Sequence, residues 1–159
     1  MNEWRRLGEE LGFTLDGDAW HGPSLREALE GVDAKAAAAR PIPGAHTIWE
    51  LVLHVTAWTR ETTRRVRGGP SGNPAEGDWP EVTSTDRAAW EAALAGLRQA
   101  HEELQRTLLE IAETDLDRQI GGSQTDSAGR PVTFHRTVVG LLQHDTYHAG
   151  QIVLLKKLP

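Results

Sequence analysis

Three long segments with helical periodicity constrain the fold of this chain more than any other feature of its sequence. In the segment 46–67, apolar residues and His54 recur at steps of three and four, which describes one face of an amphipathic helix. The segments 85–113 and 133–157 show a similar periodicity. No convincing run of alternating β-branched residues occurs elsewhere. The sequence therefore predicts an all-α domain, built as a four-helix bundle.

The remaining segments complete the bundle without adding a second domain. Residues 3–11 are predicted to form a short helix, and a second short helical piece is expected to begin at Pro23. Two connections are long. Residues 68–82 are rich in Gly and Pro, and residues 117–132 are rich in Gly, Ser and Thr. The second of them could form a short hairpin before the last helix. We find no internal repeat and no domain boundary, so residues 1–159 are predicted to form a single domain.

Net charge and cysteine content exclude several classes of function. The chain has 17 Lys and Arg against 23 Asp and Glu, and this net charge of −6 disfavours binding to a phosphate backbone. It has no cysteine, which excludes disulfides, thiolate nucleophiles and cysteine-ligated metal sites. No apolar run approaches the roughly 20 residues that span a bilayer, and charges occupy the stretch where a signal peptide needs apolar residues. We therefore expect a cytoplasmic protein that binds neither nucleic acid nor membrane.

Histidine spacing on two of the predicted helices indicates a metal site. His144 and His148 are four residues apart, so both imidazoles lie on one helix face, and that face is apolar. His54 lies in the middle of another apolar stripe, where an imidazole without a partner would cost free energy. If the two helices face each other, three imidazoles converge and suit Zn²⁺, Ni²⁺, Fe²⁺ or Co²⁺ with open coordination positions. The alternative is a seam of histidines that are each hydrogen-bonded to a neighbour.

Two polar residues near these histidines are candidates for catalytic roles. Glu50 precedes His54 by four residues, so its carboxylate could orient an imidazole or act as a base. A solvated helix carboxylate is the alternative. Gln151 follows His148 by three residues and could reach the edge of the site, or else form a hydrogen bond between helices.

Four further residues carry weaker expectations. Trp58 is interpreted as a wall of the core or of a pocket that binds a cofactor. His21 lies in a segment that could cover the mouth of the bundle and bind substrate, with a hydrogen bond at a helix entry as the alternative. His101 has two glutamates after it and is expected at the surface. Asp145 lies about 100° around the helix from its neighbour His144, so we expect it to contact an arginine instead of a metal.

Three stretches of the sequence form a specific combination of motifs. They are A-W-H-G-P-S-L at 19–25, G-A-H-T-I-W-E-L-V-L-H-V-T-A-W at 44–58 and H-D-T-Y-H-A-G-Q-I at 144–152. With these motifs the chain resembles the DinB-like superfamily, also described as DinB/YfiT-like, over nearly its whole length. The resemblance implies a four-helix bundle of up-down-down-up type that commonly forms a homodimer. It also implies a divalent ion bound by His54, His144 and His148.

The resemblance extends to mycothiol-dependent maleylpyruvate isomerases and bacillithiol transferases. It therefore implies an S-transferase that uses a low-molecular-weight thiol and a small-molecule substrate, with zinc or nickel as the ion and iron, cobalt or manganese as alternatives. A hydrolase that activates water on the same ion is one alternative function. A non-catalytic, stress-related protein in which the ion only joins helices is another. The arginines at 60, 64, 65 and 67 are expected to form a solvated helix end, or to dock an acidic thiol cofactor.

Overall fold

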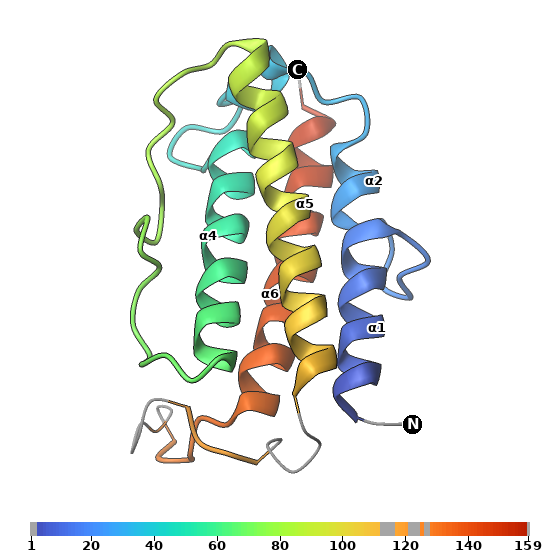
Figure 1. Ribbon diagram of the computed structural model, residues 1–159. Coiled ribbons are helices and arrows are strands. Elements are labelled where there is room, and N and C mark those ends of the chain that lie inside the picture. The colour runs from blue at the N-terminus through green and yellow to red at the C-terminus, as the bar shows by residue number, and fades with distance from the viewer. Residues whose placement is uncertain (1–2, 112–116, 121–124, 126–127, 159) are drawn as a thin grey trace.

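Four long helices pack side by side in the computed structural model, which describes residues 3–111, 117–120, 125 and 128–158 (Figure 1). The long helices are α1 (Glu3–Asp16), α4 (Ile48–Val66), α5 (Arg87–Glu110) and α6 (Phe134–Lys156). Two short helices, α2 (Leu25–Leu29) and α3 (Ala34–Ala38), connect α1 to α4. Helices α1 and α6 run in one direction, and α4 and α5 run in the other. The predicted all-α bundle of up-down-down-up type is confirmed.

Side-chain caps determine where the long helices begin. Thr47, Asp86 and Thr133 each accept a hydrogen bond from the backbone N–H three residues later, at the starts of α4, α5 and α6. Such caps satisfy backbone donors that the first turn of a helix leaves without partners.

Among the described residues, no helix combines the length and the hydropathy that a membrane crossing requires.

The connection before α6 contains antiparallel pairing but no strand within its described residues. Isolated bridges join Gln119 to Thr133 and Thr125 to Pro131. The N–H of Ile120 donates to the carbonyl of Val132 at 2.9 Å. The predicted hairpin is therefore present as isolated bridges, and its residues 121–124 and 126–127 lie outside the described part of the chain.

A layer of buried polar side chains divides the apolar core into two clusters. One cluster includes Ile48, Val52 and Val55 of α4 with Ile152 of α6, and the other includes Val66 of α4. The second cluster also holds Leu104 and Leu108 of α5 and Phe134, Val138 and Leu141 of α6. Between these groups lie His101 of α5, Asp145 and His148 of α6, and buried threonines with Glu61 of α4. His54 lies between Val52 and Val55 of the first cluster, and its ring contacts that of His148. Burying unpaired polar groups is costly, and two buried atoms of this layer, Nδ1 of His144 and Oδ1 of Asp145, have no hydrogen-bond partner among the described residues.

Arginines near the end of α4 hold the connection to α5 along that helix. The connection, residues 67–86, runs back beside α4 as the long green coil of Figure 1. The guanidinium groups of Arg64 and Arg65 donate to the carbonyls of Pro70 and Gly72 in this connection.

All four arginines that were expected to form a solvated helix end have carboxylate partners. Arg60 and Arg67 pair with Glu76 and Glu103, and the other two pair with Glu61. Their charges therefore hold the chain together locally, which leaves them less available to an acidic cofactor.

Replacing Glu61 with glutamine is expected to lower the free energy of unfolding at pH 7 by about 2 kcal/mol, because charge-assisted hydrogen bonds are lost. The Glu61 side chain is buried and accepts bonds of 2.6 Å from Arg64 and 2.7 Å from Arg65. Burial alone would raise the pKa of Glu61, but the hydrogen bonds from Arg64 and Arg65 outweigh it and hold the pKa below its usual value.

The sign of this pKa shift makes the effect dependent on pH. A carboxyl whose folded pKa is lowered stabilises the fold fully above its unfolded pKa of about 4.3 and loses that contribution as pH falls through the folded pKa. Urea unfolding between pH 7 and pH 3 should therefore show the difference between wild type and Glu61→Gln shrinking in acid. Glu91→Gln, which removes an exposed pair with Arg87, should change little at any pH. A difference that is constant with pH would contradict the assignment.

Candidate metal centre

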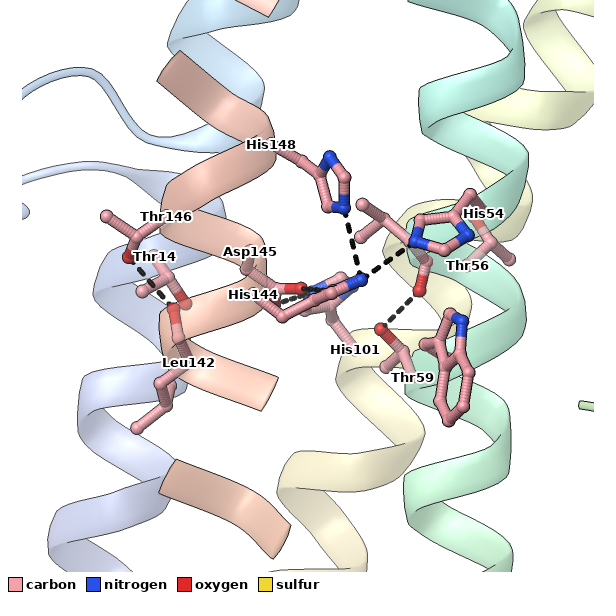
Figure 2. A network of polar contacts seen from close by, with 12 residues as sticks. Thr14, His54, Thr56, Thr59, His101, Leu142, His144, Asp145, Thr146 and His148 are labelled. Carbon is pink, nitrogen blue, oxygen red and sulfur yellow. Dashed lines mark hydrogen bonds and ion pairs between the residues drawn. The ribbon is translucent and has the colours of Figure 1, made fainter. Parts of the chain in front are cut away.

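The imidazoles of His54, His144 and His148 converge in the polar layer between α4 and α6 (Figure 2). Nε2 of His144 lies 2.9 Å from Nε2 of His54 and 3.1 Å from Nε2 of His148. One ligand atom from each residue lies within 4.8 Å of the other two, so the three-His group could hold a metal ion. The predicted convergence is confirmed, and we call these residues the three-His group below.

The three-His group is buried on two sides and open on one. His54 and His148 are buried, whereas 26% of the His144 side chain is exposed. Nδ1 of His144 is itself buried, so the exposed surface belongs to the other atoms of this side chain. A small molecule can therefore approach the group past His144, as an open coordination site requires.

Two of the imidazoles have oxygen acceptors at Nδ1. Nδ1 of His54 lies 2.6 Å from the backbone carbonyl of Asp78, and Nδ1 of His148 lies 2.6 Å from Oε1 of Gln151. A carbonyl oxygen can only accept, so each Nδ1 carries the proton and each Nε2 presents its lone pair to the centre of the group. Neighbouring oxygen atoms fix ligand imidazoles in this way in metal sites.

The third imidazole faces a fully buried pair of residues, His101 and Asp145. Oδ1 of Asp145 lies 3.6 Å from Nδ1 of His144, and Oδ2 lies 2.9 Å from Nε2 of His101. His101 in turn bonds the carbonyl of Leu97 through Nδ1 at 2.9 Å. Asp145 thus connects a candidate ligand to a residue of α5, and its carboxylate favours a proton at Nδ1 of His144.

Mutual hydrogen bonding keeps the buried pair charged. Burial would lower the pKa of His101, but the hydrogen bond that Nε2 donates to Asp145 and the negative charge of that carboxylate outweigh this effect and raise the pKa. Burial would likewise raise the pKa of Asp145, and the contact with His101 lowers it below its usual value. The carboxylate therefore supplies negative charge next to the three-His group.

The structure overturns two predictions about this pair. His101, expected at the surface, is fully buried, and Asp145 contacts two histidines instead of an arginine. The helical spacing of His101 could have predicted its burial. His101 lies four residues after Leu97 and three before Leu104, and both leucines are buried in α5. The adjacent glutamates concealed this position within the apolar stripe.

Burial keeps two members of the three-His group neutral. It lowers the pKa of His148 to about 4, and the neighbouring imidazoles act in the same direction. Burial also lowers the pKa of His54, against the raising effect of the bond to Asp78. Neutral imidazole is the form that binds metal ions. Lone pairs that face one another without a proton between them repel, and a cation among them would remove that repulsion. The donor set therefore fits a divalent transition metal.

The connection between α4 and α5 adds two residues that the sequence analysis did not single out. Trp79 stacks against His54 with a centroid distance of 3.9 Å and against His46 with a centroid distance of 3.4 Å, so it lies between them. The carboxylate of Asp78 accepts a hydrogen bond from Nε1 of Trp58 at 2.7 Å. The connection has no periodicity, so no local pattern could place these side chains at the group.

The structure brings two of the four other predicted residues to the three-His group. Gln151 bonds His148, as given above, and the Trp58 ring lies 6.4 Å from the rings of His54 and His144. The ring of Trp58 therefore lies beside two of the candidate ligands. The cofactor-binding role of Trp58 and the catalytic role of Gln151 stay predictions.

The other two predicted residues lie elsewhere in the fold. Glu50 accepts the N–H of Thr47 at 2.7 Å in a capping box and pairs with Arg40 at 2.7 Å. Together these contacts lower the pKa of Glu50 even though burial alone would raise it. His21 is exposed in the connection between α1 and α2. The catalytic role of Glu50 and the binding role of His21 stay predictions.

Comparison with models of protein families gives a match. A family model described as the DinB superfamily matches residues 19–152, a range that contains the whole three-His group and both residues of the buried pair. A search of the curated proteins found no match, and neither did a search of the solved structures.

Proposed function

Because the chain belongs to the DinB superfamily, we propose that it is a metal-dependent enzyme whose His54, His144 and His148 bind a divalent transition metal ion. The convergence of three Nε2 atoms, two of them on imidazoles protonated at Nδ1, carries this proposal. Zinc and nickel suit a set of neutral nitrogen ligands best, with iron, cobalt and manganese as alternatives.

We propose S-transfer from a low-molecular-weight thiol as the reaction. A divalent ion supplies Lewis acidity, which favours the anionic form of a thiol or of water. The chain has no cysteine, so sulfur chemistry requires a thiol from solution. The open side of His144 admits such a molecule, and Trp79 covers one face of His54 and keeps water from it. Water can also enter past His144, which supports hydrolysis as the second candidate.

The chain's own residues hold the ligands in the geometry that either reaction needs. Asp78 and Gln151 keep the protons of His54 and His148 on Nδ1, and Asp145 faces Nδ1 of His144. Each ligand therefore needs no change of tautomer when the ion binds, which lowers the cost of binding. We further propose, from the resemblance alone, a homodimer.

Thiol-dependent turnover is the expected result for the protein purified without a His tag and loaded with zinc or nickel. The assay combines a series of small thiols with an activated aryl halide, and in parallel measures hydrolysis of an aryl ester without thiol. His148→Ala should abolish turnover, because it removes one nitrogen from the three-His group. His135→Ala, which changes a partly exposed histidine in the first turn of α6, should retain it.

The outcomes of this assay separate the candidate functions. Ester hydrolysis that needs the ion and ignores thiol would replace the transferase proposal with the hydrolase. If the protein binds the ion stoichiometrically but catalyses neither thiol transfer nor ester hydrolysis, a protein in which the ion only joins helices would be favoured. A protein that takes up no ion would overturn the whole proposal.

A further inference from the structure

A pocket with a volume of about 340 Å³ adjoins the three-His group and shares His148 with it. Gln151, which bonds Nδ1 of His148, and Trp79, which stacks on His54, also line it. The pocket therefore contacts one candidate ligand directly and a second one through Trp79. A molecule bound in it would lie next to the reacting centre.

The walls of this pocket are apolar and aromatic. Leu51 of α4, Leu154 and Leu155 of α6 and the rings of Trp79 and Tyr147 line it, together with Ile42 and Ala45. No Asp, Glu, Lys or Arg is among the described residues that line it. The polar side chains in the wall are the imidazoles of His46 and His148, the amide of Gln151 and the hydroxyl of Tyr147. Such a wall stabilises an uncharged group and disfavours a charged one, which would lose its hydration.

Exposed apolar side chains gather around this pocket. The described part of the chain exposes eight large hydrophobic side chains, and four of them line the pocket: Ile42, Trp79, Tyr147 and Leu154. Apolar surface that is concentrated at a recess is typical of a binding site, because a bound molecule removes it from water.

A second, larger pocket offers a contrast. It has a volume of about 710 Å³ and lies along α1, where Arg5, Glu9, Arg26 and Glu27 line it. It is therefore a charged groove, and it shares no described residue with the three-His group. The apolar recess next to His148 is the better match to a substrate of the candidate site.

We propose that the pocket next to His148 binds an uncharged, apolar part of the substrate, of the size of an aromatic ring, while the reacting atom of the substrate lies at the three-His group. That the bound molecule is a substrate rests on the proposed function. The preference of the pocket for uncharged aromatic groups follows from its walls alone. A small molecule is favoured over a second copy of the chain because the surface is a recess that ends on a candidate ligand.

Benzyl alcohol and benzylammonium are a matched pair of probes for this inference, since they share a ring and differ in charge. Both are titrated into the zinc-loaded and the metal-free protein, and the shift of the Trp79 indole N–H, identified with Trp79→Phe, reports binding in NMR spectra. Benzyl alcohol should bind at least about tenfold more tightly than benzylammonium, because the cation loses hydration that these walls do not replace.

Substitutions of two equally exposed leucines test whether benzyl alcohol binds in this pocket. Leu154→Ala should weaken binding of benzyl alcohol about threefold to tenfold, because it removes apolar surface from the wall. Leu109→Ala, on α5, should leave binding unchanged. Both leucines are 64% exposed, so neither substitution opens a cavity in the core. Equal binding of the two probes, or equal effects of the two variants, would overturn the inference.

Three further outcomes separate this inference from the proposed function and from dimer formation. If the probes and variants behave as expected but no turnover occurs, the proposed function fails while the binding preference stands. If turnover occurs and Leu154→Ala leaves KM unchanged for aryl and alkyl substrates alike, the pocket inference fails alone. If benzyl alcohol does not bind and Leu154→Glu converts a dimer to a monomer in sedimentation, a second copy covers the pocket, which also overturns the inference.

Discussion

Replacing His144 with alanine is expected to weaken binding of a divalent ion by more than about 100-fold. Its Nε2 lies between those of His54 and His148, at 2.9 and 3.1 Å, so its loss leaves two ligands with no third nitrogen to complete the set. Loss of a residue that only orients a ligand already costs about 10- to 100-fold in metal affinity, and loss of a ligand should cost more. Metal analysis of the untagged protein before and after reconstitution measures the effect.

The same variant separates a ligand from a merely structural histidine. In the metal-free protein, His144→Ala removes one of three facing lone pairs from a partly exposed position, so its free energy of unfolding should hardly fall. In the presence of the ion, wild type should gain stability by mass action and the variant should not. His135→Ala should behave as wild type in both experiments. Unchanged uptake of the ion by His144→Ala would contradict the assignment of the site.

Replacing Asp145 with alanine is expected to lower the free energy of unfolding by about 3 to 5 kcal/mol, because it leaves His101 buried without its partner. Both side chains are fully buried and lie 2.9 Å apart. The double variant with His101→Ala should lose much less than the sum of the two single variants, since the second substitution removes the orphaned group. Urea unfolding of wild type, both single variants and the double variant measures this coupling. Additive effects would contradict it.

Asp145 should also raise the affinity of the site for the metal ion, whereas a purely structural residue would leave that affinity unchanged. Its Oδ1 faces Nδ1 of His144 at 3.6 Å, so Asp145→Asn should weaken zinc affinity about 10- to 100-fold even where the protein stays folded. Asparagine keeps the shape of aspartate and should recover part of the stability lost in Asp145→Ala, but it lacks the negative charge. Zinc affinity of Asp145→Asn equal to that of wild type would limit the role of Asp145 to packing.

Periodicity predicted the long helices because each of them buries one continuous stripe. The segment 46–67 contains α4 and the segment 133–157 contains α6, with each observed end within two residues of its prediction. The first helix was predicted too short, since α1 continues to Asp16 before Gly17 adopts a positive φ. Helix α3 was missed, because its five residues, four alanines and a lysine, include no large apolar side chain that would mark a buried face.

The sequence by itself determined the long helices and the spacing that places His144 and His148 on one helix face. The directions of the helices followed from the family resemblance. These properties depend on residues close together in the chain or on a motif, so they can be inferred without coordinates. The burial of His54 in an apolar stripe belongs to the same class.

Only the tertiary structure decided which groups distant in sequence support the ligands. Asp78 reaches His54 across 24 positions of sequence, and His101 reaches Asp145 across 44. Such contacts depend on how the helices are rotated against one another and on where an aperiodic connection crosses them, and no local pattern encodes either. The apolar pocket next to His148 has the same origin, since its walls come from the segment before α4, from α4 itself, from Trp79 and from α6.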